Sequence, residues 1–274
     1  MGSDSASKIN QILKLWPYGT VALSNWLESH GMYQQLAHKY ENTQWLERVG
    51  HGAFIRSGDK VDWQGALYAI QTQAGLQIHV AAKSALELHG ITHFVPARKR
   101  NLFLFAAPRT ALPSWFKNRD WGVTIRYAAP ALFIDGFRDS FPGPNAPGIT
   151  EKNFGTFSIR MSSPERGILE LLYLVPTQQQ YEEAKLLFEG LRALRPHLVQ
   201  SLLEACKSIK VKRLFLHLAD ATGQPWLEDL KVDKIDLGKG KRVIAPGGHF
   251  DSKYNISVPK IHDGEAIKED EADL

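Results

Sequence analysis

The chain has 274 residues, 43% of them hydrophobic, and a formal net charge of +4, which suits a globular protein of two or three modules. No apolar run approaches the roughly 20 residues of a membrane-spanning helix, and the first residues, MGSDSASK, lack the apolar centre of a secretory signal. The single cysteine, Cys206, excludes an internal disulfide and no Cys/His cluster suggests zinc, so we expect a cytoplasmic protein without a metal or cofactor.

The first predicted element is an amphipathic helix. Ile9, Ile12 and Trp16 recur at helical intervals, which predicts a helix over residues 5–15 that Pro17-Tyr18-Gly19 ends. This helix is expected to pack under the elements that follow it and to complete a small core.

Two short helices separated by a glycine come next. Thr20 is expected to cap the first of them, whose apolar face holds Leu23, Trp26 and Leu27. Gly31 gives the turn its backbone freedom. The second helix is predicted over residues 33–42, with an inward face formed by Tyr33, Leu36 and Tyr40.

The opposite side of the second helix is polar. At about 3.6 residues per turn, Gln35, His38 and Asn42 project away from the apolar face, with Gln34 and Lys39 beside them. Gln and Asn can make paired hydrogen bonds to adenine edges, and Lys can reach guanine or phosphate. We interpret this side as a DNA-reading face; the alternatives are an ordinary solvated face and a protein-interaction module.

A hairpin is predicted over residues 45–56, because Gly50-His51-Gly52 lies between β-favouring residues. Arg48, His51 and Arg56 lie on or near it, where a wing would contact the DNA backbone. Two helices followed by such a hairpin form the winged helix-turn-helix pattern. Residues 1–60 hold six Lys/Arg and five Asp/Glu, so neighbouring segments would have to supply positive charge.

The remainder predicts a larger mixed α/β domain, which makes the fold class α+β. Helices are expected at residues 63–73, 81–89, 178–192, 196–207 and 212–220. Strands are expected at residues 101–106, 123–127, 157–161, 242–245 and 254–258, and a Pro/Gly-rich loop at 141–155. A central helix starts either with Ser163 as cap before Pro164, or with Ser162 and Glu165 in a capping box.

Positive charge gathers in three places outside the winged segment and offers a possible additional nucleic-acid surface, although each cluster can equally be a solvated face. The candidate residues are Arg98, Lys99, Arg100, Lys210, Lys212, Arg213, Lys239, Lys241 and Arg242. The last residues, 261–274, are acidic and are expected to form a disordered tail.

Two motifs invite a catalytic interpretation. Gly238-Lys239-Gly240-Lys241 lacks the spacing of a phosphate-binding loop, so it is interpreted as a basic turn before a strand. Asp229-Leu230-Lys231, with Asp220 nearby, has the D-x-K arrangement of metal-dependent nucleases and leaves a nuclease as an alternative function. His89 and His93 lie four apart but lack a third ligand, so they are interpreted as surface histidines.

Several segments, taken in order, resemble the AbiEi antitoxins of type IV toxin–antitoxin systems. They are WLERVGHGAFIRSGDKVDWQGALYAIQ, VAAKSALELHG, MSSPERGILELL, LLEACKSIKVKRLFLHLAD, KIDLGKGKRVIAPGG and YNISVP. The resemblance extends over roughly residues 9–259 and stops before the acidic tail.

This resemblance implies a winged DNA-binding domain at residues 5–60 and an antitoxin domain at 61–260, and it leaves the tail at 261–274 outside both. It implies a repressor that binds double-stranded DNA at inverted repeats in its own promoter. The motifs considered above do not form a catalytic site, so we expect a protein that is not an enzyme. The functional partner would be an AbiEii-type nucleotidyltransferase toxin, without an assumed direct contact. The DNA-binding residues that the resemblance implies are Gln34, Gln35, His38, Lys39, Asn42, Arg48, His51 and Arg56.

Overall fold

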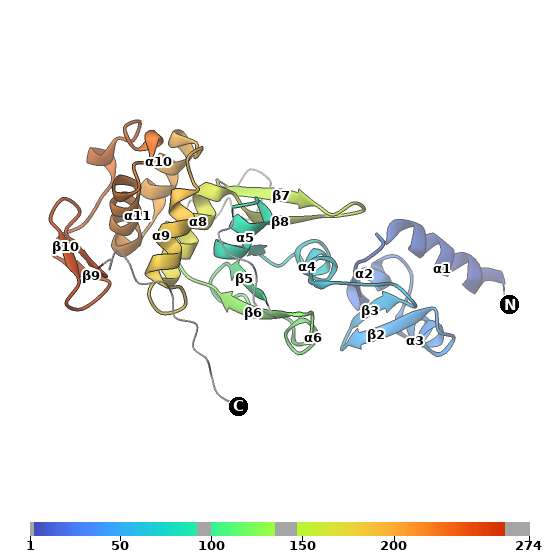
Figure 1. The fold of residues 1–274 in the computed structure, drawn as a ribbon. Helices are drawn as coiled ribbons and strands as arrows, with labels where there is room; N and C mark the ends of the chain where they lie inside the picture. The colour runs from blue at the N-terminus through green and yellow to red at the C-terminus, as the bar shows by residue number, and fades with distance from the viewer. Residues whose placement is uncertain (1–2, 92–99, 135–146, 261–274) are drawn as a thin grey trace, which may run out of the picture.

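The computed structural model describes residues 3–91, 100–134 and 147–260, with side chains from Lys8 onward. Its elements are arranged along one direction: the N-terminal helices and hairpin lie at one end and a small C-terminal sheet lies at the other (Figure 1). A five-stranded sheet and the helices on its two faces occupy the middle. The fold is therefore α+β, as the sequence predicts.

The N-terminal unit is a winged helix-turn-helix. Its helices are α1 (Ser3–Leu15), α2 (Ser24–Ser29) and α3 (Gln34–Asn42). Its strands are β1 (Ala22–Leu23), β2 (Leu46–Gly50) and β3 (Ala53–Arg56), paired in the order β1-β3-β2. Ile9, Ile12 and Trp16 pack with residues of α2, α3 and the hairpin in one small buried core, which explains their helical spacing.

Two local expectations for this unit are wrong. Thr20 does not cap α2, whose N-cap is Leu23; the Thr20 hydroxyl donates to the carbonyl of Pro17 and accepts from the indole of Trp16. Tyr33 is 60% exposed, because it precedes α3 as its N-cap and lies outside the buried face. Met32 and Ala37 are buried in the small core instead.

The middle of the molecule is a mixed sheet in the order β6-β5-β4-β8-β7. Its strands are β4 (Ile78–Val80), β5 (Arg100–Ala106), β6 (Val123–Ala128), β7 (Ile149–Asn153) and β8 (Ser158–Ser162). Both faces of β5 are buried: Leu102 and Leu104 face one core, and Phe103 and Phe105 face the other. The expected loop at 141–155 is wrong at 149–153, because these residues pair with β8 as the sheet edge; residues 141–146 lie outside the described residues.

One face of this sheet is covered by α4 (Trp63–Thr72), which also carries the winged unit. The Gln73 side chain, just after α4, accepts a hydrogen bond from the amide of Leu23 and donates one to the carbonyl oxygen of Val21. These two residues lie on either side of Ala22 in β1. A Cβ on Gly65 would lie 1.7 Å from the carbonyl oxygen of Gly19, so only glycine permits this close approach. Buried contacts thus fix the winged unit to the sheet.

The other face is covered by helices: α5 (Ala82–Leu88), α8 (Pro164–Leu174), α9 (Tyr181–Glu189), α10 (Pro196–Ala205) and α11 (Ile209–Ala221). Of the two starts expected for α8, the structure has Ser163 as N-cap and Pro164 at the first helical position. The α8 helix is buried almost all round, in agreement with its apolar sequence. Short helices α6 (Ser114–Lys117), η1 (Pro225–Leu227) and η2 (Val232–Lys234) complete the helical part.

The chain then forms a second small sheet in the order β10-β11-β9. Its strands are β9 (Arg242–Val243), β10 (His249–Asp251) and β11 (Ile256–Val258), of which β10 is not among the strands that the sequence predicts. Ile256 and Val258 are buried against the helical core, which holds this sheet on the end of the molecule away from α3 (Figure 1).

Candidate nucleic-acid interface

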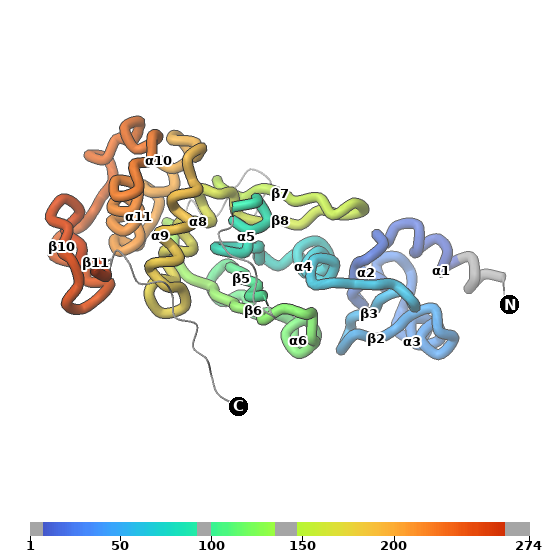
Figure 2. The backbone as a smooth tube through the Cα atoms, viewed as in Figure 1, coloured from blue at the N-terminus to red at the C-terminus, as the bar shows by residue number. Residues whose placement is uncertain are grey.

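The outer face of α3 is exposed and polar. Gln34, Gln35, His38, Lys39 and Asn42 are all exposed on it. The helix lies at the outer edge of the winged unit, beside the β2–β3 hairpin and away from the central sheet (Figure 2). Ala37 and Tyr40, on the opposite side, are buried in the small core. A duplex can therefore approach this face without displacing another element.

The hairpin is braced from behind by α6. A Cβ on Gly50 would lie 2.5 Å from the Cβ of Trp115, so β2 and α6 are in direct backbone contact. Together with the contacts of α4, this brace fixes the winged unit relative to the central part of the molecule. His51 is exposed at the hairpin tip, where a wing contact is expected.

Arg48 connects the hairpin to Glu41, the one carboxylate of α3. Glu41 is half-buried, and its carboxylate also lies 3.3 Å from the His38 ring. The Arg48 guanidinium donates to both carboxylate oxygens of Glu41, at 2.9 and 2.8 Å, and lies 4.6 Å from the ring centroid of Phe54. The hydrogen bonds from Arg48 lower the pKa of Glu41 to about 2, so the pair stays ionised at neutral pH. The charge of Arg48 is thus balanced within the protein, and a phosphate contact by this residue stays a prediction.

Arg56 is not on the surface, so its expected role as an exposed wing residue is wrong. It is buried, donates to the carbonyls of Leu13 and Trp16 at the end of α1, and its guanidinium lies 4.0 Å from the ring centroid of Tyr18. The cation therefore ties α1 to β3 and satisfies carbonyls that the helix end leaves without partners. The sequence could not distinguish this use of arginine from a phosphate contact.

Exposed cations lie near the hairpin on the α6 side. Lys117 and Arg119 border a cleft of about 870 Å³ between the α6 segment and β6. The pKa of Glu47 in the hairpin is lowered mainly by hydrogen bonds from Gly58 and Ser57, and the nearby charge of Arg119 lowers it further. Arg100 is exposed at the start of β5, whereas Arg98 and Lys99 lie outside the described residues. Positive charge from the α6 segment is therefore placed beside the wing.

The C-terminal basic residues separate into two groups. Lys212 and Arg213 are buried and Lys210 is half-buried; all three donate to backbone carbonyls, so the expectation that they form an exposed surface is wrong. Apolar spacing on α11 could not reveal this, because long cationic side chains can bury their stems. Lys239, Lys241 and Arg242 are exposed.

The three nuclease candidates do not converge. Asp220 accepts from Lys253 and Tyr254, and the cavity that it lines is bordered by neither Asp229 nor Lys231. The described residues contain no group of three or more His, Cys, Asp or Glu side chains able to hold a metal ion. Burial raises the pKa of the Cys206 thiol to about 11, which leaves it protonated. His89 donates from Nε2 to the carbonyl oxygen of Ser162 at 3.0 Å, and His93 lies outside the described residues.

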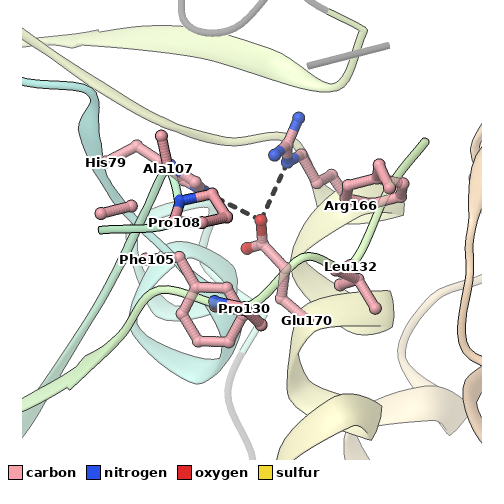
Figure 3. Close-up of a pocket in the computed structure, with 10 residues that line it drawn as sticks. His79, Phe105, Ala107, Pro108, Pro130, Leu132, Arg166 and Glu170 are labelled. Carbon is pink, nitrogen blue, oxygen red and sulfur yellow. Dashed lines mark hydrogen bonds and ion pairs between the residues drawn. The ribbon is translucent and has the colours of Figure 1, made fainter. Parts of the chain in front are cut away.

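A buried charged cluster that no sequence pattern indicates joins β4 to α8. Glu170 binds His79 at 2.8 Å and Arg166 at 2.8 Å, as Figure 3 shows, and it accepts from the hydroxyl of Ser162 at 2.6 Å. Burial lowers the pKa of His79, which is therefore neutral at pH 7. The adjoining cavity has a volume of about 30 Å³, room for a water molecule but not for a substrate. The cluster is structural, because it satisfies its own charges.

No helix in the described ranges combines the length and apolar character that crossing a membrane requires. A comparison with curated proteins found no match. Among solved structures, the RV2827C protein from Mycobacterium tuberculosis aligns with a TM-score of 0.56 over 92% of this chain and 90% of its own, at 13% identity. At that identity the likeness shows the fold alone.

Two family models match the chain. The N-terminal domain model of the AbiEi antitoxin transcriptional regulators covers residues 5–97. The model described as transcriptional regulator, AbiEi antitoxin, type IV TA system covers residues 99–259. Together they span nearly all of the residues that the structure describes. The chain therefore belongs to the AbiEi family of transcriptional regulators, the antitoxins of type IV toxin–antitoxin systems.

Proposed function

We propose that this antitoxin represses its own operon by inserting α3 into the major groove of promoter DNA, with the β2–β3 hairpin against the backbone. The observation that carries the proposal is the outer face of α3, whose exposed side chains are rich in amide groups and include no carboxylate. Membership of a family of transcriptional regulators supports it. An α-helix fits the major groove, where amide side chains can distinguish base pairs.

The side chains divide by role. Gln35, His38 and Asn42 lie in a row along the helix and can reach base edges, with Gln34 at the helix start. Lys39 supplies the positive charge of this face and is assigned to guanine or phosphate. Because Arg48 pairs with Glu41, its first contribution is to hold the hairpin against α3.

Positive charge for the phosphates comes from outside α3. Lys117 and Arg119 beside the hairpin supply this charge and extend the surface past the winged unit, and His51 at the hairpin tip can donate a hydrogen bond to a phosphate. Phosphate contacts supply most of the affinity for DNA regardless of sequence. This supports a footprint that continues past the winged unit onto the α6 segment.

We further infer that the promoter site consists of inverted repeats, each bound by one copy of the chain. The larger domain carries the antitoxin activity against a nucleotidyltransferase-like toxin of the AbiEii type, without a stable complex between the two proteins. We propose the boundaries 5–60 for the DNA-binding part and 61–260 for the antitoxin part. The lack of convergence of Asp220, Asp229 and Lys231 favours a binding function over a nuclease.

A gel-shift experiment with the DNA upstream of the gene tests the proposal. We expect the full-length protein to bind that fragment more tightly than random duplex at moderate salt. Lys39→Gln should weaken binding to both sequences and reduce the slope of log affinity against log salt by about 1. Arg192→Gln, which removes one exposed charge beyond α9, is the matched control and should change neither value. Equal binding of upstream and random DNA by the wild-type protein would count against the proposal.

A further inference from the structure

The loop between η2 and β9 is shaped by a buried cation. Arg213 on α11 donates to four carbonyl oxygens: Leu237 at 2.8 Å, Gly238 at 3.0 Å, Gly240 at 2.6 Å and Asn255 at 2.8 Å. Beside it, Lys212 donates to the carbonyl of Asp236 at 3.0 Å. Carbonyl groups of the loop thus point inward, and its conformation is set before any ligand arrives.

Two glycines, Gly238 and Gly240, let the loop adopt this conformation, and the lysines beside them are exposed to solvent. Gly238 and Gly240 have φ of +64° and +74°, a conformation that favours glycine. A Cβ on Gly238 would lie 3.0 Å from a side-chain carbon of Ile209, so the loop also lies tightly on α11. Between and after these glycines, Lys239, Lys241 and Arg242 are exposed. The loop therefore presents Lys239 and Lys241 from a fixed backbone.

Beside this loop, the outer face of the C-terminal sheet is apolar and unusually exposed. Phe250 on β10 and Val243 on β9 both pair with Ser257 on β11, so the three side chains lie on one face. The residues on either side of Ser257, Ile256 and Val258, are buried in the core, which makes the Ser257 face the outer one. On it Phe250 is 43% exposed and Val243 is 55% exposed.

On this face the side chain of Lys241 lies over the aromatic ring of Phe250. The ammonium of Lys241 lies 4.4 Å from the ring centroid of Phe250. The carboxylates nearest in sequence are engaged elsewhere: Asp236 accepts from the amide of Gly238, and Asp251 shares a hydrogen bond of 2.6 Å with Nδ1 of His217. Arg242 pairs with Ile256, so its side chain lies on the opposite face of the sheet. We call the set Lys239, Lys241, Val243 and Phe250 the cationic platform.

We propose that the cationic platform is a second nucleic-acid site, one that binds a single strand by stacking an unpaired base on Phe250 while Lys239 and Lys241 contact the flanking phosphates. An exposed aromatic ring in a cationic groove is the combination that single-strand binders use. A duplex offers phosphates but no free base face, so Phe250 favours an unpaired base. An exposed cation–π contact is weaker than base stacking, so a base can take the place of Lys241 over the ring.

The site is independent of the proposed promoter contact. The platform lies on the small sheet at one end of the molecule and α3 lies at the other, as Figure 1 shows. A promoter duplex seated on α3 would leave the platform open. A single strand could then be bound by the same copy of the chain, and loss of one activity should not abolish the other.

Fluorescence anisotropy with the full-length protein tests this site, with fluorescein-labelled U12 RNA, dT12 DNA and a 12-base-pair duplex as probes. We expect one or both single strands to bind more tightly than the duplex, and their ratio identifies the source as RNA or DNA. Phe250→Ala should weaken single-strand binding about tenfold or more. Lys241→Gln should reduce the salt slope by about 0.7.

Two control variants distinguish base stacking at this site from a general effect of charge or apolar surface. Arg192→Gln removes an exposed charge beyond α9 and should leave single-strand affinity unchanged. Phe250→Leu keeps an apolar side chain on the partly exposed position and should weaken binding nearly as much as alanine if the ring stacks on a base. Undiminished binding by Phe250→Ala, or equal competition by poly-glutamate, overturns the proposal in favour of an acidic protein partner; absence of single-strand binding overturns it outright.

Discussion

Arg56 illustrates how one residue type serves different purposes in this chain. Its buried guanidinium binds the carbonyls of Leu13 and Trp16, and Tyr18 lies 4.0 Å over it. Arg213 is used in the same way under the basic loop, whereas Lys39 projects into solvent. The carbonyl groups around each cation decide its role. For Arg56 these carbonyls belong to residues 40 or more positions away in the sequence.

Replacing Arg56 should therefore affect stability first. Arg56→Ala leaves buried carbonyls without a donor and should lower the free energy of unfolding by about 2–4 kcal/mol, whereas Lys39→Ala should change it by less than about 0.5 kcal/mol. Urea denaturation followed by tryptophan fluorescence measures both. If Arg56→Ala kept full stability while losing DNA affinity, the residue would be a DNA contact after all.

Acid sensitivity should centre on Glu165 at the start of α8. Burial acts to raise its pKa, but hydrogen bonds from Arg195 and Ser163 outweigh burial and lower the pKa to about 2. Because the unfolded carboxyl titrates near its ordinary value of about 4.3, the unfolded state binds more protons between these values. Stability is then fully present above about pH 5 and falls as the pH is lowered toward 2.

This pH dependence can be assigned with a variant. Between pH 5 and pH 3, Glu165 should account for about 1–2 kcal/mol of the loss in unfolding free energy. Glu165→Gln should be less stable at pH 7 but lose correspondingly less on acidification, as measured by urea midpoints at each pH. An identical loss in variant and wild type would assign the acid sensitivity to other carboxyls, such as buried Glu170.

At the scale of elements, docking of the winged unit depends on α4. The Gly65 position tolerates no Cβ because the Gly19 carbonyl would lie 1.7 Å away, while at Gly167 in α8 a Cβ would meet its nearest atom, in Leu86, at 3.4 Å. Alanine is the better helix former by about 1 kcal/mol, so a helical glycine with space should gain from the change.

The two glycines thus form a matched pair. Gly65→Ala should destabilise the protein by about 2 kcal/mol or more, whereas Gly167→Ala should lie between neutral and a gain of about 1 kcal/mol. Thermal or urea unfolding of the two variants side by side gives the comparison. Equal effects would mean that the α4 contact with the Gly19 turn is not a rigid joint.

Elements with strong periodicity could be predicted, and short paired strands could not. The α1, α3 and α8 helices follow apolar spacing that burial enforces, and the β2–β3 hairpin follows its glycine-containing tip. By contrast, β1 and β4 have two and three residues, and β7 is a polar edge strand after a Pro/Gly-rich stretch. Their strand character comes from partners distant in sequence, which no local pattern contains.

The part of the candidate site on α3 could be predicted from the sequence, whereas the roles of the residues beside α3 could not. The exposed positions of α3 follow from geometry once Leu36, Ala37 and Tyr40 face inward. The pairing of Arg48 with Glu41 and the burial of Arg56 depend on tertiary contacts. The same holds for the cationic platform, whose aromatic residue Phe250 joins the basic loop only through pairing of β10 and β9 with β11.

At the scale of the whole molecule, the arrangement separates two surfaces. The outer face of α3 lies at one end, the cationic platform at the other, and a sheet with buried helices fills the space between them (Figure 1). Since α4 and α6 both contact the winged unit, this unit is held firmly by its neighbouring elements rather than linked loosely to them. The distance between the ends lets promoter binding and single-strand binding be tested independently.

The central claim, that the amide groups of α3 read a duplex, is tested most directly by the ratio of affinities for upstream and random DNA. We expect Gln35→Ala/Asn42→Ala to reduce this ratio by tenfold or more, since each lost base contact costs about 1–3 kcal/mol, while affinity for random duplex stays nearly constant. Competition binding at fixed salt gives the ratio for variant and wild type. Full discrimination retained by the double variant would contradict the claim.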